Sequence, residues 1–367
     1  MSQSKVAKIL KITRRREIRP PPGAMPGALT VDPNAARPVI DVMGYGPEAL
    51  VELRDATMAD LDGFIGKHRV VWINVTGLGD PAIIQAFGTR FGFHRLSLAD
   101  VVHTYQRPKV ENYDGYLYLV FRAPEPGPEH SVVTEQISLF LMKGIVITFQ
   151  EGRADCFEGV RDRIRRSLGR IRAAEADYLA YSLLDAGTDG FFPVVERIGD
   201  EIESIEEGLT ASWSTSTTHA IYQLRHQLMV VRRAVWPLRD LTNTLLRDEC
   251  PVITQETRVY IRDCYDHCVQ LMDLVDNHRE ISTSLMEMQL SLASYRMNEV
   301  MRVLTVIATL FMPLTFIVGI YGMNFDRDAS ALSMPELGWK YGYVGCLALC
   351  AVIAGAMLFY FRRRQWL

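Results

Sequence analysis

Cysteine is scarce in this chain, and its spacing argues against a disulfide scaffold. The six cysteines of the 367 residues lie far apart, except for Cys264/Cys268 and Cys346/Cys350. Each of these pairs is four residues apart within a helical pattern, which fits a reducing compartment for most of the chain. An excess of charge is also missing, because the net charge is only −3. Without a basic field or a nucleic-acid motif, we expect no nucleic-acid partner.

Signals for catalysis and for nucleotide binding are absent as well. No GxGxxG or P-loop pattern follows any candidate strand, so we expect no organic cofactor. Cys264, His267 and Cys268 share a helical face and resemble soft-metal ligands, but three ligands on one helix favour an ordinary packed cluster. No Ser/His/Asp or Cys/His arrangement is recognisable, so the sequence does not predict an enzyme. A signal peptide is not predicted either, because the basic start has no apolar core.

The first half of the sequence predicts a tail and a small α/β domain. Residues 1–36 are basic and rich in Pro and Gly, and residues 37–155 mix strand and helix patterns. Buried strands are predicted at Val70–Val75 and Tyr116–Phe121. Ile137–Met142 and Ile145–Phe149 flank Lys143-Gly144, which predicts a tight hairpin.

Residues 156–255 predict long charged helices, at 157–210 and 217–248. The first carries an acidic stretch and the second several arginines, which favours two antiparallel helices with complementary faces. Alternatively, the acidic stretch concentrates cations. The acidic residues are Asp200, Glu201, Glu203, Glu206 and Glu207, and the arginines are Arg225, Arg232, Arg233 and Arg239.

Glycine and proline are nearly missing from the next segment. Between Thr257 and Ile320 there is one proline, Pro313, and no glycine before Gly319. About 60 helical residues would measure about 90 Å, more than a domain of this size needs. We therefore predict a stalk helix over 256–302 that leaves the domain.

Two segments after the stalk contain no charged residue, and each is long enough to cross a membrane. They predict a first span at 303–325 and a second span at 341–361. The residues between them, 326–340, then form an external loop, and residues 362–367 form a basic tail. Arg296, Arg302 and Arg362–Arg364 mark one side as cytoplasmic by the positive-inside rule. We therefore predict that both termini are cytoplasmic, and we expect the membrane to be a bacterial inner membrane.

Two helices cannot enclose a polar path, so the spans either anchor the domain or build a pore in an oligomer. Small, polar or flexible residues recur along the first span in steps of three and four, as a pore-lining face requires. Helix packing by small residues explains the same stripe equally well. The stripe comprises Asn298, Met301, Thr305, Ala308, Met312, Thr315 and Gly319.

The end of the first span favours the pore. Tyr321-Gly322-Met323-Asn324-Phe325 is followed by Met334-Pro335-Glu336-Leu337 in the loop. At this place the sequence resembles the CorA family of magnesium and cobalt transporters. The resemblance extends from Gln106–Glu111 through Tyr181–Ala186 to the C-terminus and is densest from Asn298 to Phe325. It implies an α+β cytoplasmic domain joined to long stalk helices and two C-terminal transmembrane helices, in a funnel-shaped homopentamer.

The resemblance also implies a set of functional residues. Gly322, Met323 and Asn324 would form the selectivity filter, and the Asn324 amides would accept hydrogen bonds from the waters of hydrated Mg²⁺. Glu336 would attract cations to the mouth. The pore and gate would comprise Asn298, Met301, Leu304, Thr305, Ala308, Met312 and Gly319, with the apolar members blocking ions by dewetting.

Gating would depend on cytoplasmic Mg²⁺, which is then both cargo and regulatory ligand. Asp100 and Asp263 match the family's acidic pair between subunits, and Asp185 is a third candidate. Ala99 stands where relatives often have a carboxylate, and Asp326–Ser333 lengthen the external loop. Two alternatives remain: a zinc transporter of the same architecture, with or without proton coupling, and a membrane-anchored scaffold that conducts nothing.

Overall fold

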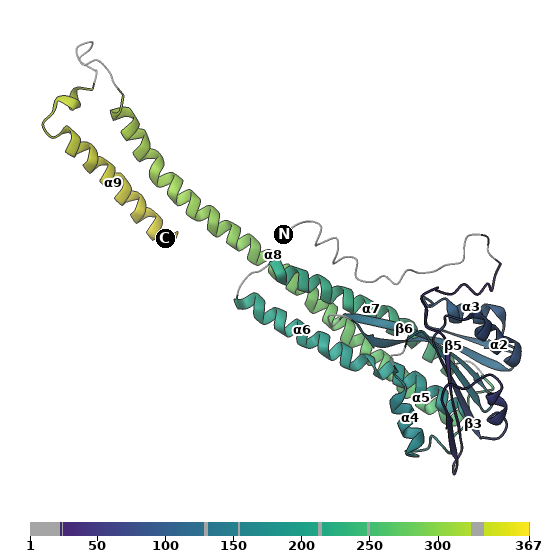
Figure 1. The fold of residues 1–367 in the computed structure, drawn as a ribbon. Helices are drawn as coiled ribbons and strands as arrows, with labels where there is room; N and C mark the ends of the chain where they lie inside the picture. Colours follow the sequence, from purple (N-terminus) through teal and green to yellow (C-terminus); the bar gives the residue numbers. More distant parts are fainter. Residues whose placement is uncertain are drawn as a thin grey trace. The chain divides into compact units, whose positions relative to one another are not determined.

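The computed structural model describes residues 23, 25–127, 131–152, 155–211, 215–247, 250–323 and 334–366 (Figure 1). The chain divides into two compact units. The first contains the residues up to Thr210 together with Thr215–Ser284, and the second consists mainly of Leu285–Leu367. Each is described by itself below.

A seven-stranded mixed sheet forms the centre of the first unit. The strand order is β2-β1-β3-β7-β6-β5-β4, and β3 pairs with β7 in parallel while the other neighbours are antiparallel. The predicted strands at 70–75 and 116–121 and the hairpin around Lys143-Gly144 are confirmed. Gly144 takes a positive φ of 75° in the hairpin turn, a conformation that favours glycine. The strands are β1 Val39–Tyr45, β2 Leu50–Leu53, β3 Val70–Thr76, β4 Lys109–Tyr113, β5 Tyr116–Pro126, β6 Val132–Met142 and β7 Ile145–Gln150.

Helices cover both faces of this sheet (Figure 1). In β3, Val70 and Trp72 point into one apolar core, and Val71 and Ile73 point into the other. Both faces of the strand are thus buried, which explains its unbroken apolar sequence. The short helices η1 Asp60–Gly63, α2 Pro81–Phe91 and α3 Arg95–Val102 cover one face. Longer helices, including the start of α8, cover the other.

The single helix predicted at 157–210 is wrong. Three helices occupy this segment: α4 Glu158–Arg165, α5 Ala176–Asp189 and α6 Phe191–Ala211. The break after α4 contains Ser167 and Gly169, whose positive φ angles end a right-handed helix. Local charge patterning did not reveal this break. The predicted second helix is α7, Thr215–Arg247.

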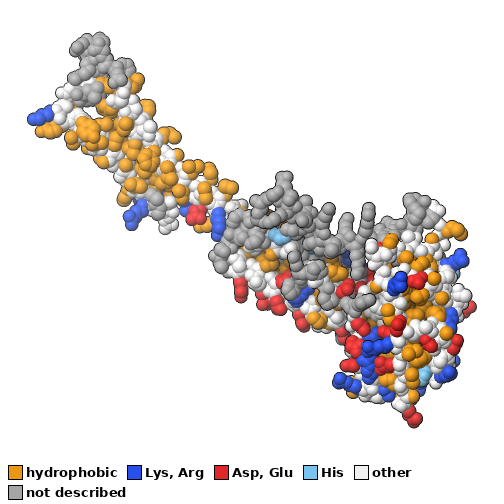
Figure 2. Space-filling view, viewed as in Figure 1, with side chains coloured by type: hydrophobic (Ala, Val, Ile, Leu, Met, Phe, Trp, Pro, Cys, Tyr) orange, Lys and Arg blue, Asp and Glu red, His pale blue; other side chains and the backbone are white. Residues whose placement is uncertain are grey.

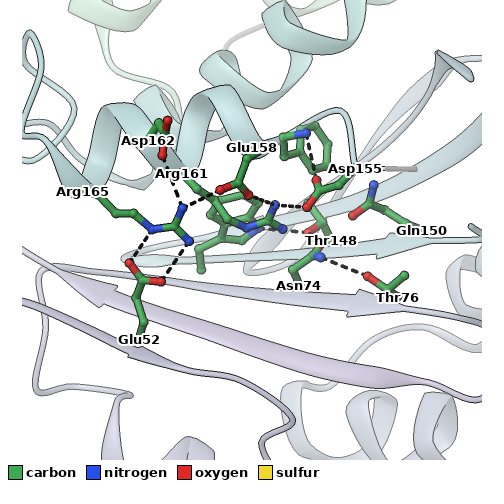
Figure 3. A network of polar contacts seen from close by, with 12 residues as sticks. Glu52, Asn74, Thr76, Thr148, Gln150, Asp155, Glu158, Arg161, Asp162 and Arg165 are labelled. Atoms are coloured by element: carbon green, nitrogen blue, oxygen red, sulfur yellow. Dashed lines mark hydrogen bonds and ion pairs between the residues drawn. The ribbon is translucent and has the colours of Figure 1, made fainter. Parts of the chain in front are cut away.

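A polar network attaches α4 to the sheet (Figure 3). Both carboxylate oxygens of Glu52 on β2 accept hydrogen bonds from Arg165, at 2.9 and 3.1 Å. The Arg161 guanidinium lies 4.9 Å from the ring centroid of Trp72 and is ion-paired with Asp155. These bidentate and cation–π contacts fix α4 beside the sheet edge.

The continuous helix predicted from 257 to 320 is confirmed. Helix α8 extends over 67 residues, Gln255–Tyr321, with Pro313 inside it. It is followed by η3 Pro335–Gly338 and α9 Gly342–Arg363. Both α8 and α9 contain windows that are long and apolar enough to cross a membrane, and only 6% of each window is buried in the single chain. Figure 2 shows hydrophobic side chains crowded over the C-terminal part of α8 and over α9.

Candidate pore helix and metal-binding residues

The predicted pore residues lie on α8 with their side chains exposed in the single chain. Met301, Leu304 and Met312 are 52%, 57% and 70% exposed, and Asn298, Thr305, Ala308 and Gly319 are exposed as well. The Thr305 hydroxyl donates to the Met301 carbonyl at 2.7 Å, so its proton is already used within the helix. An apolar helix with so little buried surface needs lipid or further protein around it.

The end of α8 leads directly into the predicted filter. The Gly322 and Met323 amides donate to the carbonyls of Val318 and Ile320, which close the last turn. A Cβ on Gly322 would lie 3.2 Å from the Val318 oxygen, so glycine allows this close backbone approach. Asn324 lies outside the described residues, and so does the side chain of Glu336.

Three side chains with metal-ligating atoms meet between α5 and α8. The His267 Nδ1 atom lies 3.0 Å from Asp189 Oδ1 and 3.8 Å from Asp185 Oδ1. One ligand atom from each residue lies within 4.8 Å of the others. Asp263 lies at the edge of this cluster, 4.0 Å from His267 Nε2. Carboxylate oxygens and an imidazole nitrogen together suit a divalent metal ion.

Asp185 is the most buried member of this cluster, with a side chain only 14% exposed. Its Oδ2 accepts a hydrogen bond from the Tyr181 hydroxyl at 3.2 Å, whereas its Oδ1 has no hydrogen-bond partner among the described residues. Burial, together with the charge of Asp189, raises the pKa of the Asp185 carboxyl to about 6, while His267 and the hydrogen bond from Tyr181 oppose this rise. An arriving cation would relieve this unfavourable environment.

The neighbouring cysteines are not part of the cluster. Cys264 and Cys268 are fully buried in the core, whereas His267 is 31% exposed and faces the acids. The sequence interpretation grouped His267 with the cysteines and missed Asp189. The spacing of four residues between Asp185 and Asp189, and between Asp263 and His267, was the available signal.

Asp177 fixes the start of α8 to α5. Its Oδ2 accepts hydrogen bonds from the Thr254 amide at 2.8 Å and from the Thr254 hydroxyl at 2.7 Å. Thr254 immediately precedes α8, and Asp177 is in the first turn of α5. The two helices that carry the metal-ligating residues are therefore joined at one end.

Asp100, on α3, belongs to a different polar cluster. Its carboxylate binds Lys109 and Gln106, at 2.6 and 2.8 Å. Asp263, with a side chain 64% exposed, lies on α8. The polar contacts of Asp100 and of Asp263 join them to different residues. Their pairing between neighbouring subunits stays a prediction.

The sequence of the chain matches a family model over residues 67–363, and the family is described as CorA-like Mg²⁺ transporter proteins. This chain belongs to that family. It is 43% identical over 329 residues to the cobalt/magnesium transport protein CorA of Thermotoga maritima, covering 89% of this chain and 92% of that one. It is 34% identical to the putative metal ion transporter YfjQ of Bacillus subtilis, covering 80% and 89%.

The CorA fold is also shown by a solved structure. The complete structure of the CorA magnesium transporter from Methanocaldococcus jannaschii has a TM-score of 0.76 at 23% identity, and the match covers 90% of this chain and 99% of that one. The predicted family is therefore confirmed, and so is the predicted fold of the single chain, an α/β domain joined to a long helix and two C-terminal apolar helices. CorA-like proteins form a class of transporters of Mg²⁺ rather than a class of enzymes.

Proposed function

We propose that this chain is an inner-membrane channel that admits hydrated Mg²⁺, and also Co²⁺, through a pore formed by five identical subunits. The observation that carries this proposal is α8, one unbroken helix of 67 residues. It carries Asp263 and His267 near its start, the exposed stripe from Asn298 to Gly319 in its second half, and Gly322 directly after its end. The proposed sensor and pore residues thus lie on one continuous helix.

The pore is lined by the α8 stripe around a symmetry axis. Two apolar helices per chain cannot enclose a polar path by themselves, but several copies around an axis can. Met301, Leu304 and Met312 form apolar constrictions that exclude water when the helices approach one another. Asn298 forms a polar ring at the cytoplasmic end, and α9 faces the lipid.

The filter recognises an ion that keeps its water. Mg²⁺ gives up its hydration shell reluctantly, so a cage of bare ligands would hold it too long. A ring of Asn324 amide oxygens accepts hydrogen bonds from the bound water molecules and adds no fixed charge that would trap the ion. Glu336 raises the cation concentration at the outer mouth. No ATP is required, because a divalent ion that moves down 100 mV gains about 4.6 kcal/mol.

Cytoplasmic Mg²⁺ closes the channel. At high concentration it binds Asp100 of one subunit together with Asp263 of its neighbour, and it occupies the Asp185, Asp189 and His267 cluster within each subunit. The bridged ring is the closed state. When Mg²⁺ leaves, repulsion between carboxylates loosens the ring and shifts the population toward open states. The N- and C-termini lie on this cytoplasmic side.

Flux into liposomes tests the proposal. Purified full-length protein should conduct Mg²⁺ when a negative interior potential is imposed, and Asn324→Ala should abolish flux while the oligomer still assembles. Asn277→Ala makes the same change at an exposed position of α8 outside the pore stripe, so it is the matched control and should conduct. Undiminished flux through Asn324→Ala would refute the filter assignment. Flux of Zn²⁺ alone would support the zinc transporter, and no flux of any divalent ion would support the scaffold.

A further inference from the structure

Lys109 forms an ion pair with the carboxylate of Asp100 in the same subunit. Its Nζ atom lies 2.6 Å from Asp100 Oδ2 and 2.6 Å from Glu111 Oε1, so one ammonium group bridges two carboxylates. The side chain of Asp100 is 20% exposed, and that of Lys109 is 30% exposed. Burial alone lowers the pKa of Lys109, but the hydrogen bonds to the two carboxylates raise it above its ordinary value, so the ammonium stays charged.

Two glutamines, Gln106 and Gln136, hold Asp100 through hydrogen bonds that do not involve Lys109. Gln136, which is buried, donates to the Asp100 carbonyl at 2.8 Å and accepts from the Gln106 amide at 2.8 Å. Gln106 in turn donates to Asp100 Oδ1 at 2.8 Å. A neutral amide can remain when a metal ion binds the same carboxylate, because a carboxylate offers about four lone-pair sites.

A positive ammonium cannot remain beside a divalent ion at this distance, because like charges repel strongly near a partly buried carboxylate. Lys109 has a flexible four-carbon stem and a second acceptor in Glu111. Glu111 is itself held by the Tyr113 hydroxyl, which donates to its Oε2 at 2.8 Å. Lys109 can therefore leave Asp100 and stay on Glu111 when a metal ion arrives.

We propose that Lys109 is a tethered competitor that sets the Mg²⁺ concentration at which Asp100 binds metal and that discriminates against monovalent ions. The proposal rests on the proposed sensor role of Asp100. A sodium or potassium ion carries the same charge as the Lys109 ammonium, which its own chain holds close to Asp100. A monovalent ion therefore gains no electrostatic energy by replacing the ammonium. A divalent ion is attracted to the carboxylate about twice as strongly and displaces the ammonium. The site then responds to Mg²⁺ against a background of monovalent salt.

Protection of the full-length protein in detergent from chymotrypsin, titrated with Mg²⁺, tests this inference. Lys109→Met should lower the half-maximal Mg²⁺ concentration about threefold to fivefold, as expected for loss of one partly exposed ion pair. A higher NaCl concentration should reduce the difference in half-maximal Mg²⁺ concentration between Lys109→Met and the native protein, because Na⁺ then binds Asp100 where the ammonium was. Lys109→Arg keeps the positive charge, so its half-maximal Mg²⁺ concentration should equal or exceed that of the native protein. The matched control Lys143→Met removes an exposed lysine in the β6–β7 turn and should change nothing.

An unchanged half-maximal concentration in Lys109→Met, while Asp100→Asn weakens protection, would overturn the role of Lys109 alone. If Asp100→Asn leaves the Mg²⁺ dependence intact, the sensor assignment fails and the inference fails with it. Should Lys109→Met not assemble, Glu111→Gln provides a second test. Without Glu111 the ammonium binds Asp100 alone, so the half-maximal concentration should rise, and a fall would contradict the proposal.

Discussion

Replacing Asp185 with Asn should stabilise the metal-free protein at alkaline pH. The folded chain holds the Asp185 carboxyl at a pKa of about 6, against an ordinary value of 3.8. Because the folded state binds this proton more tightly, stability is lost as the pH rises from about 4 through about 6. Above that range the charged carboxylate costs up to about 3 kcal/mol relative to a neutral side chain. Solvent at the exposed edge screens part of this, so we expect a gain of about 1–3 kcal/mol at pH 8.

The assay is thermal unfolding of the full-length protein in detergent with a chelator, at pH 5 and at pH 8. The apparent midpoint of Asp185→Asn should exceed that of the native protein at pH 8, and the difference should shrink at pH 5. The charged or titratable groups that interact with Asp185 are Asp189, His267, Tyr181, Asp263 and Cys264, and they are unchanged in the variant. Asp114→Asn, in the exposed β4–β5 turn, is the matched control and should shift the midpoint little at either pH.

Mg²⁺ should reverse this order of stability. A bound cation offsets the charge that makes native Asp185 unfavourable, so the native protein should gain more from Mg²⁺ than Asp185→Asn does. A variant that is no more stable than the native protein at pH 8 without metal would refute the electrostatic reasoning. Equal gains from Mg²⁺ in both proteins would place the responding ion elsewhere.

Three further changes test other parts of the structure. Asp263→Asn should raise the Mg²⁺ concentration needed for protection from protease, and an unchanged titration would remove Asp263 from the sensor. Asp177→Ala deletes the acceptor of two hydrogen bonds from Thr254 and should lower the free energy of unfolding by about 1–3 kcal/mol. Thermal unfolding measures this loss, and an unchanged midpoint would show that other contacts hold the start of α8. Met301→Asn places a polar ring in the apolar constriction and should increase Mg²⁺ flux into liposomes at high internal Mg²⁺, so a flux as low as that of the native protein would locate the gate at another residue.

Features that depend on neighbouring residues were predictable from the sequence. The hairpin around Lys143-Gly144 follows from two apolar runs and a glycine at the turn. The continuity of α8 follows from the near absence of glycine and proline, and the two apolar spans follow from the absence of charge. In each case, the determining interactions are between residues a few positions apart, or between a segment and its solvent.

Only the tertiary structure decided which distant residues meet. Asp189 and His267 are separated by 78 positions and come together because α5 and α8 both bury their apolar faces in the same core. The division of 157–210 into three helices has the same origin, since α5 must pack across the sheet and the chain has to turn on either side of it. The contact of Lys109 with both Asp100 and Glu111 depends on the placement of α3 beside β4. Periodicity reports which face of a helix is buried, but the partner of that face is set by packing over the whole domain.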